Sequence, residues 1–125
     1  MKPLLTGKTA IITGASKGIG LATAKLFVEQ GANVVLTALK QADLDAVVKE
    51  IQDAGGNALG IVADSADPAA PRLVFAKAID AFGQVDILVN NAGYGDMMSI
   101  EEYTDEHFDE VVQVNYAGVF RFCRE

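Results

Sequence analysis

The segment Thr13-Gly14-Ala15-Ser16-Lys17-Gly18-Ile19-Gly20 constrains the fold of this chain more than any other stretch. It follows an apolar run at residues 9–12 and precedes an amphipathic helical pattern over residues 21–30. We therefore predict a strand, a glycine-rich turn and a helix, in that order. Such a turn leaves unpaired backbone N–H groups at a helix N-terminus, where they can hold a phosphate group. Glycine also lets a ligand approach the backbone closely, so the segment predicts a nucleotide site.

The rest of the chain alternates between apolar runs and helical patterns. Strands that alternate with helices of about 10–15 residues indicate βαβ units and a parallel sheet. Continuous apolar strands are expected when helices cover both faces of the sheet, and right-handed crossovers would give the strand order 3-2-1-4. We predict strands at residues 8–13, 33–38, 58–63 and 85–90, and helices from Ser16 or Lys17 to Gln30, over 41–54, from an N-cap at Asp67-Pro68 to about Phe82, and from an N-cap at Thr104 to residue 125.

Length and composition fit one domain that covers residues 1–125 and has a sizeable core, because 50% of the residues are hydrophobic. The formal net charge of −7 argues against nucleic acid or an anionic membrane surface as a partner. The sequence has no apolar run near the roughly 20 residues of a transmembrane helix, and its start lacks a secretory pattern, so we expect a cytoplasmic protein. The single cysteine, Cys123, supports no disulfide or metal site. We expect Cys123 to be partly buried and the single histidine, His107, to be solvated.

The end of the sequence predicts a domain that is C-terminally incomplete. The last helix has no glycine or proline to end it, and its apolar residues from Phe108 to Phe122 lie near one side. In the order 3-2-1-4, the apolar strand at residues 85–90 would be a bare edge. We therefore expect the first half of a larger doubly wound domain, truncated before its later strands.

Four motifs together resemble the classical short-chain dehydrogenase/reductase family, N-terminal half only. The glycine segment has the spacing Thr13-Gly14-x-x-x-Gly18-Ile19-Gly20, which differs from the commoner Gly-x-Gly-x-x-Gly fingerprint. Asn90-Asn91-Ala92-Gly93 follows the fourth predicted strand, Asp64 follows the third, and Asn115 lies in the last helix. Each motif lies on the element where this family has it, and the resemblance covers essentially the whole chain.

The resemblance implies a Rossmann-type fold and a nicotinamide dinucleotide. The glycine turn would hold the pyrophosphate, and Asp64 would accept a hydrogen bond from the adenine amino group. Asn115 would bend the last helix and hold a water molecule of a proton relay, so it is the one candidate catalytic position. The candidate cofactor-binding residues are Gly14, Ser16, Lys17, Gly18, Ile19, Gly20, Ala38, Lys40, Asp64, Ser65, Asn90, Asn91, Ala92 and Gly93.

Each motif also has a purely structural interpretation. The glycines could form a strand–helix turn that binds nothing, and Asp64 could be an exposed loop acid. Asn90 and Asn91 could serve only turn hydrogen bonds, and Asn115 could only kink its helix. The acidic residues of the second and last helices are expected to be solvated.

The end of the second strand bears on the choice between NADP and NAD. An acid there binds the ribose 2′-hydroxyl of NAD, whereas a basic residue suits the 2′-phosphate of NADP. This chain has Thr37-Ala38-Leu39-Lys40 and no acid, and Lys17 lies in the glycine turn. We therefore favour NADP(H) over NAD(H), although NADP-preferring relatives often carry arginine near Leu39.

By resemblance, the parent reaction is hydride transfer between NADP(H) and a carbonyl/alcohol substrate. The family uses a later serine and a Tyr-x-x-x-Lys pair, in which the lysine lowers the pKa of the tyrosine. Here Tyr94, Tyr103 and Tyr116 are followed four positions later by methionine, histidine and phenylalanine. We therefore expect a cofactor-binding half that is inactive alone. The alternatives are a non-enzymatic nucleotide-binding or interaction module, which would self-associate through the strand edge or the last helix, and a truncated product without function.

Overall fold

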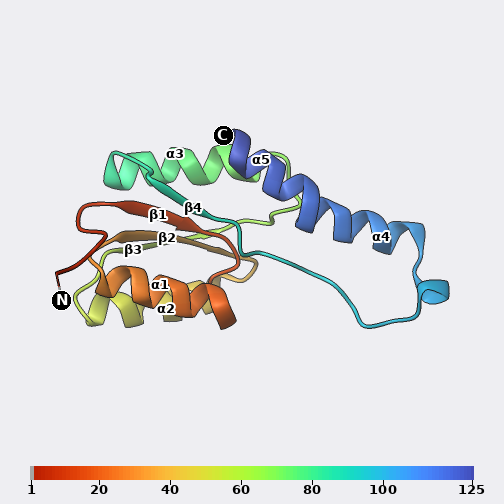
Figure 1. Ribbon diagram of the computed structural model, residues 1–125, viewed down its shortest axis with the longest axis horizontal. Helices are drawn as coiled ribbons and strands as arrows, with labels where there is room; N and C mark the ends of the chain where they lie inside the picture. The colour runs from red at the N-terminus through yellow and green to blue at the C-terminus, as the bar shows by residue number, and fades with distance from the viewer. Residues whose placement is uncertain (1) are drawn as a thin grey trace.

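The computed structural model describes residues 2–125 and shows a parallel sheet between two layers of helices (Figure 1). The strand order is β3-β2-β1-β4, and β1 pairs in parallel with both β2 and β4. This confirms the predicted α/β/α architecture and the strand order 3-2-1-4. The elements are β1 (Thr9–Ile12), α1 (Gly18–Glu29), β2 (Asn33–Ala38), α2 (Gln41–Asp53), β3 (Ala58–Val62), α3 (Ala70–Phe82), β4 (Ile87–Val89), a 3₁₀ turn (Ile100–Glu102), α4 (Asp105–Val112), a π-helical segment (Gln113–Ala117) and α5 (Gly118–Arg124).

Each face of the sheet has its own core, because successive strand residues point to opposite faces. Ile12 of β1 packs with Leu44 in the core beneath α1 and α2. Its neighbour Ile11 packs with Val74 of α3 and Phe122 of α5 on the other face. Figure 1 shows these pairs of helices on opposite sides of the sheet. The carboxyl ends of all four strands consequently meet at one edge, where the predicted site residues lie.

The start of α3 corrects the predicted N-cap at Asp67-Pro68. The helix begins at Ala70, and Pro71 occupies its first turn. The Asp67 carboxylate accepts a hydrogen bond from the Ala69 N–H at 2.9 Å, and the Asp67 carbonyl accepts one from the Ala70 N–H at 3.1 Å. Aspartate can form such a local turn in competition with a helix start, so one turn of chain precedes the helix.

The last helix is continuous from Asp105 to Arg124, but it contains the π-helical segment Gln113–Ala117. The predicted N-cap is confirmed, since the Thr104 hydroxyl accepts a hydrogen bond from the His107 N–H at 3.1 Å. The predicted common apolar side is wrong, because Phe122 is 2% exposed whereas Phe108 is 59% exposed. Cys123 is exposed, which corrects the expectation that it is partly buried.

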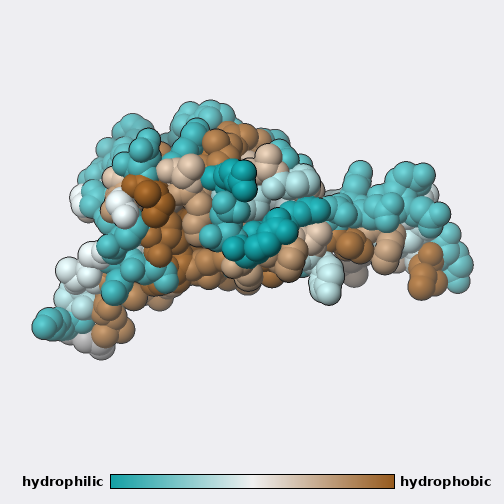
Figure 2. All heavy atoms as spheres, turned by 90° about the horizontal axis from the view of Figure 1, so that it is seen from above, coloured by the Kyte–Doolittle hydropathy of each residue, from teal (hydrophilic) through white to brown (hydrophobic). Residues whose placement is uncertain are grey.

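After β4 and the braced residues 91–93, residues 94–125 form an arm that runs away from the sheet and returns through α4 (Figure 1). Figure 2 shows this arm as a narrow extension of the broader main body. No residue of α4 is buried. Within residues 2–125, no helix is both long enough and apolar enough to cross a membrane.

Candidate functional site

The glycine-rich turn leaves β1 at the carboxyl edge of the sheet, between β2 and β4. Gly14 and Gly18 have φ angles of +63° and +62°, which favour glycine. A Cβ atom at Gly14 would lie 2.9 Å from the Cα atom of Ala92, and one at Gly20 would lie 2.5 Å from Nδ2 of Asn91. Glycine is therefore required both for backbone conformation and for close packing against the segment after β4.

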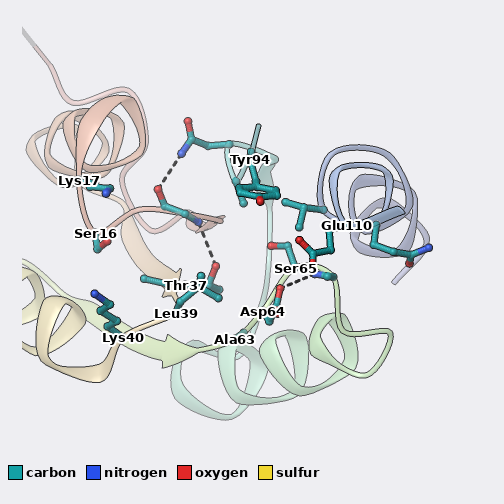
Figure 3. Close-up of a pocket in the computed structure, with 18 of the residues that line it drawn as sticks. Ser16, Lys17, Thr37, Leu39, Lys40, Ala63, Asp64, Ser65, Tyr94 and Glu110 are labelled. Carbon is teal, nitrogen blue, oxygen red and sulfur yellow. Dashed lines mark hydrogen bonds between the residues drawn. The ribbon is translucent and has the colours of Figure 1, made fainter. Parts of the chain in front are cut away.

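Two buried threonines hold this turn from its two sides. The Thr13 hydroxyl accepts hydrogen bonds from the N–H groups of Asn91 at 3.1 Å and Ala92 at 3.0 Å. The Thr37 hydroxyl accepts one from the Gly14 N–H at 3.3 Å (Figure 3). Neither threonine was among the predicted site residues. The available signal was a polar side chain at the end of a strand that is otherwise buried and apolar.

Asn91 connects the same turn to the end of β4. Its Nδ2 atom donates hydrogen bonds to the carbonyl oxygens of Thr13 at 3.1 Å and Gly14 at 2.9 Å. The neighbouring Asn90 side chain instead donates to Sγ of Cys123 at 3.3 Å. The two adjacent asparagines thus have different partners: Asn91 bonds to the glycine turn, whereas Asn90 bonds to α5.

The start of α1 is open to an anion. Its N-cap residue, Lys17, has extended backbone, and among the described residues no side chain caps this end. The first N–H groups of a helix have no intrahelical acceptor, and together with the helix dipole they attract negative charge. The turn between β1 and α1 therefore has the chemistry of a phosphate site.

A cleft of about 850 Å³ lies over the carboxyl edge of the sheet. Figure 3 shows Lys17 and Lys40 on one side of it and Tyr94 and Glu110 on the other, with Asp64 and Ser65 below Tyr94 and next to Glu110. Positive charge therefore gathers near the glycine turn, and the carboxylates of α4 line the opposite wall. The lining residues are Gly14, Ser16, Lys17, Thr37, Ala38, Leu39, Lys40, Asp43, Ala63, Asp64, Ser65, Ala66, Asn91, Ala92, Gly93, Tyr94, Glu106, Asp109, Glu110, Gln113 and Val114.

The cleft brings together most, but not all, of the predicted site residues. Five of them do not line it: Gly18, Ile19 and Gly20 at the start of α1, Asn90, and Asn115. The ten that do are Gly14, Ser16, Lys17, Ala38, Lys40, Asp64, Ser65, Asn91, Ala92 and Gly93.

Asp64 and Ser65 follow β3 at the floor of the cleft. The Asp64 carboxylate is exposed and accepts a hydrogen bond from the Ala66 N–H at 2.9 Å, whereas Ser65 is buried. This carboxylate keeps a second oxygen and further acceptor positions for a ligand.

Asn115 lies behind the wall of the cleft and holds the arm. Its Oδ1 atom accepts from the Tyr94 N–H at 3.1 Å, and its Nδ2 atom donates to the carbonyl oxygens of Tyr94 at 2.6 Å and Val111 at 2.8 Å. Partial burial and the nearby carboxylates of Asp96 and Glu110 raise the pKa of Tyr94, whose side chain faces the cleft.

Comparison with known proteins shows the family of this chain. The family model described as short chain dehydrogenase matches residues 8–125, so the chain belongs to that family. An uncharacterised oxidoreductase of Methylorubrum extorquens is 45% identical over 116 residues, which are 92% of this chain and 47% of that protein.

Solved structures agree with this assignment. L-sorbose reductase from Gluconobacter frateurii, complexed with NADPH and L-sorbose, is 35% identical with a TM-score of 0.93, over 99% of this chain and 48% of that one. A short chain dehydrogenase from Burkholderia cenocepacia in complex with NADP is 41% identical with a TM-score of 0.91, over 96% of this chain and 49% of that one. The chain thus spans about half the length of the proteins it matches.

Proposed function

We propose that this member of the short-chain dehydrogenase family binds a nicotinamide dinucleotide in the cleft and is the cofactor-binding half of an oxidoreductase. The observation that carries the proposal is the glycine turn, braced from β2 and from β4, beside an uncapped helix start. A Cβ atom at Gly14 or Gly20 would collide with that brace. The residues therefore fit a pyrophosphate at the turn, with the adenine near Asp64 and Ser65.

NADP(H) is the dinucleotide that we favour. Figure 3 shows Lys17 and Lys40 on the same side of the cleft, and β2 ends at Ala38, followed by Leu39, without an acid. Asp43, three residues after Lys40, also lines the cleft, and its negative charge would repel the 2′-phosphate of NADP. Both lysines are exposed, and an exposed ion pair contributes about 0.2–1 kcal/mol. We therefore expect a modest preference for NADP over NAD.

In the whole protein, the reaction we propose is hydride transfer between NADP(H) and a carbonyl/alcohol substrate. The nicotinamide supplies or accepts the hydride, and the protein residues bind and orient it. None of the tyrosines of this chain is followed four positions later by lysine. We therefore propose that these 125 residues bind the dinucleotide but do not reduce a carbonyl by themselves.

Titration with NADPH and NADH, followed by nicotinamide fluorescence, tests the proposal. We expect saturable NADPH binding, weaker NADH binding, and loss of both in Gly14→Asp, which places a side chain and a negative charge at the brace. Lys40→Ala should weaken NADPH alone, by up to about fivefold. Absence of NADPH binding by the unmodified chain would contradict the proposal, and tighter NADH binding would reverse the cofactor preference.

A second function is favoured by a separate observation, the apolar surface of the arm. Tyr116 is 78% exposed, and Phe108 and Phe120 are each 59% exposed. The edge of β4 that faces away from β1 has no partner strand within residues 2–125. Under this alternative, the chain is an interaction module that self-associates through these surfaces. Light scattering after size-exclusion chromatography measures the mass of the chain in solution. A monomer at micromolar concentration would exclude self-association and therefore this alternative.

A further inference from the structure

The arm contains a charged cluster that the dinucleotide function does not use. Nε2 of His107 lies 2.7 Å from Oδ2 of Asp96, although the two residues are eleven positions apart in sequence. Asp96 precedes α4, whereas His107 lies within it. The His107 ring also packs against Tyr94 and Tyr103, with ring centroids 5.8 Å and 5.1 Å away. The histidine side chain is only 23% exposed, which corrects the expectation that His107 is solvated.

Both tyrosines donate hydrogen bonds to Asp96. The Tyr94 hydroxyl lies 3.3 Å from Oδ2 of Asp96 and 3.4 Å from Nε2 of His107. The Tyr103 hydroxyl donates to the Asp96 carbonyl at 3.2 Å. One acid and one histidine therefore set the positions of two phenol rings.

Tyr94 links this cluster to the cleft. Asn115 bonds to its backbone N–H and carbonyl, so the main chain of Tyr94 is fixed from the π-helical segment. Its side chain lines the cleft beside Asn91 and Gly93. With the main chain held by Asn115, the direction of the ring depends on its contacts with Asp96 and His107.

We propose that Asp96 and His107 form an ionic latch that holds the Tyr94 ring in the wall of the cleft, so that ligand binding there depends on the charge of His107. They are positioning residues, since neither lines the cleft. The dependence on a bound dinucleotide rests on the proposed function, whereas the latch itself can be measured without any ligand.

The sign of the effect follows from the charges around His107. A protonated imidazole forms an ion pair with Asp96, and a neutral one forms only a hydrogen bond, so the latch is strongest at low pH. Histidine is the side chain whose ordinary charge change falls between pH 5 and 8. The titratable groups packed against it or within one turn of its own helix are Tyr94 and Asp96 before the 3₁₀ turn, Tyr103 after it, and Asp105, Glu106, Asp109 and Glu110 in α4.

Tyrosine fluorescence can report the latch directly. The chain has one histidine, three tyrosines and no tryptophan, so its emission comes from tyrosine alone, and two of the three tyrosines touch His107. We expect one emission transition between pH 5 and 8 that is absent from His107→Gln and Asp96→Asn. It should persist in Tyr116→Phe, the matched control, which removes the tyrosine outside the cluster. A transition that survives in His107→Gln, or no transition in the unmodified chain, would overturn the proposal.

Binding of NADPH at pH 6 and pH 8 gives the second readout. Because the 2′-phosphate itself titrates near pH 6, each variant is compared with the unmodified chain at the same pH. We expect the unmodified chain to bind more tightly than His107→Gln by up to about threefold, as for an exposed ion pair, with a larger ratio at pH 6 than at pH 8. A pH-independent ratio would overturn the link between latch and cleft. If no NADPH binds while the emission transition is present, the proposed function fails and the latch stands.

Discussion

The glycine turn and the arm form opposite walls of one cleft, but they are held in place by different means. Backbone groups and buried threonine hydroxyls fix the turn, and the strands behind it are almost completely buried. The arm buries no residue of α4, and it is held by Asn115 and the Asp96–His107 pair, whose side chains are exposed or partly exposed. In α5, the last helix of the arm, only Gly118 and Phe122 are buried.

This difference indicates a fixed wall and an adjustable wall. Interactions buried in a core open only with most of the fold, whereas exposed and sparsely packed segments open locally at little free-energy cost. The wall proposed to hold the pyrophosphate is therefore expected to be the same with or without a ligand. The wall that carries Tyr94 can respond to pH and to what binds.

The largest effect is expected from Phe122→Ala, which tests whether the arm depends on one buried side chain. Removal of a buried phenylalanine costs about 3–5 kcal/mol of unfolding free energy, and Phe122 packs against Phe75 with ring centroids 6.5 Å apart. Hydrogen exchange should show lost protection in α4 and α5, with β1–β3 still protected. Phe108→Ala, at a residue 59% exposed, is the control. Equal loss of protection in β1–β3 would show that the two regions are one cooperative unit.

Gly20→Ala is expected to destabilise the fixed wall, because it adds a methyl group where the glycine turn packs against Asn91. The new methyl group would lie 2.5 Å from Nδ2 of Asn91 and 2.7 Å from the Gly14 carbonyl oxygen. Overpacking of this kind costs about 1–3 kcal/mol, and NADPH affinity should fall with it. Urea unfolding measures the first effect and fluorescence titration the second. In Gly95→Ala, the methyl group meets open space, so that variant should behave like the unmodified chain.

Thr13→Val tests how much of the stability of the fixed wall depends on a single hydroxyl group. The substitution keeps the shape of the side chain but leaves the N–H groups of Asn91 and Ala92 without their acceptor. Leaving a buried polar group unsatisfied costs about 1–3 kcal/mol. The matched change Thr23→Val removes an exposed hydroxyl that bonds only to the Ile19 carbonyl. Equal urea midpoints for the two variants would refute the bracing role of Thr13.

The smallest effect concerns charge within the main body. The Thr9 N–H donates to Oδ2 of Asp86 at 2.9 Å, and this bond is the main cause that lowers the pKa of Asp86. A carboxyl group with a lower pKa in the folded state stabilises the fold above its unfolded pKa, and the contribution is lost as pH falls through the folded value. Asp86→Asn should therefore lower the urea midpoint slightly at pH 7, and the difference from the unmodified chain should shrink as pH falls through the lowered pKa of Asp86. A difference that persists in acid would contradict this.

Local patterns were enough to predict the fold and the fixed wall. Apolar runs, helical spacing and the glycine positions each act over a few residues, so the strands and the glycine turn were predicted correctly, and right-handed crossovers then gave the sheet order. The brace itself was not predicted, because Thr13 and Asn91 are 78 residues apart. The Asp96–His107 pair lies partly in a segment without periodicity, where no pattern indicates that two charged side chains meet. The predicted start of α3 was wrong for a local reason, because the Asp67 side chain accepts a hydrogen bond from the Ala69 N–H and forms a turn before the helix.

The π-helical segment Gln113–Ala117 also sets the rotation of everything that follows it. A π turn holds about one more residue than an α turn, and each residue of an α-helix advances by roughly 100°. Phe122 therefore faces the sheet although Phe108, on the same stripe of an uninterrupted helix, faces solvent. Within the π-helical segment, Nδ2 of Asn115 donates a hydrogen bond to the Val111 carbonyl oxygen, at the point where the α-helical pattern is interrupted. Deletion of one residue here would turn Phe122 out of its core without changing any side chain that contacts it.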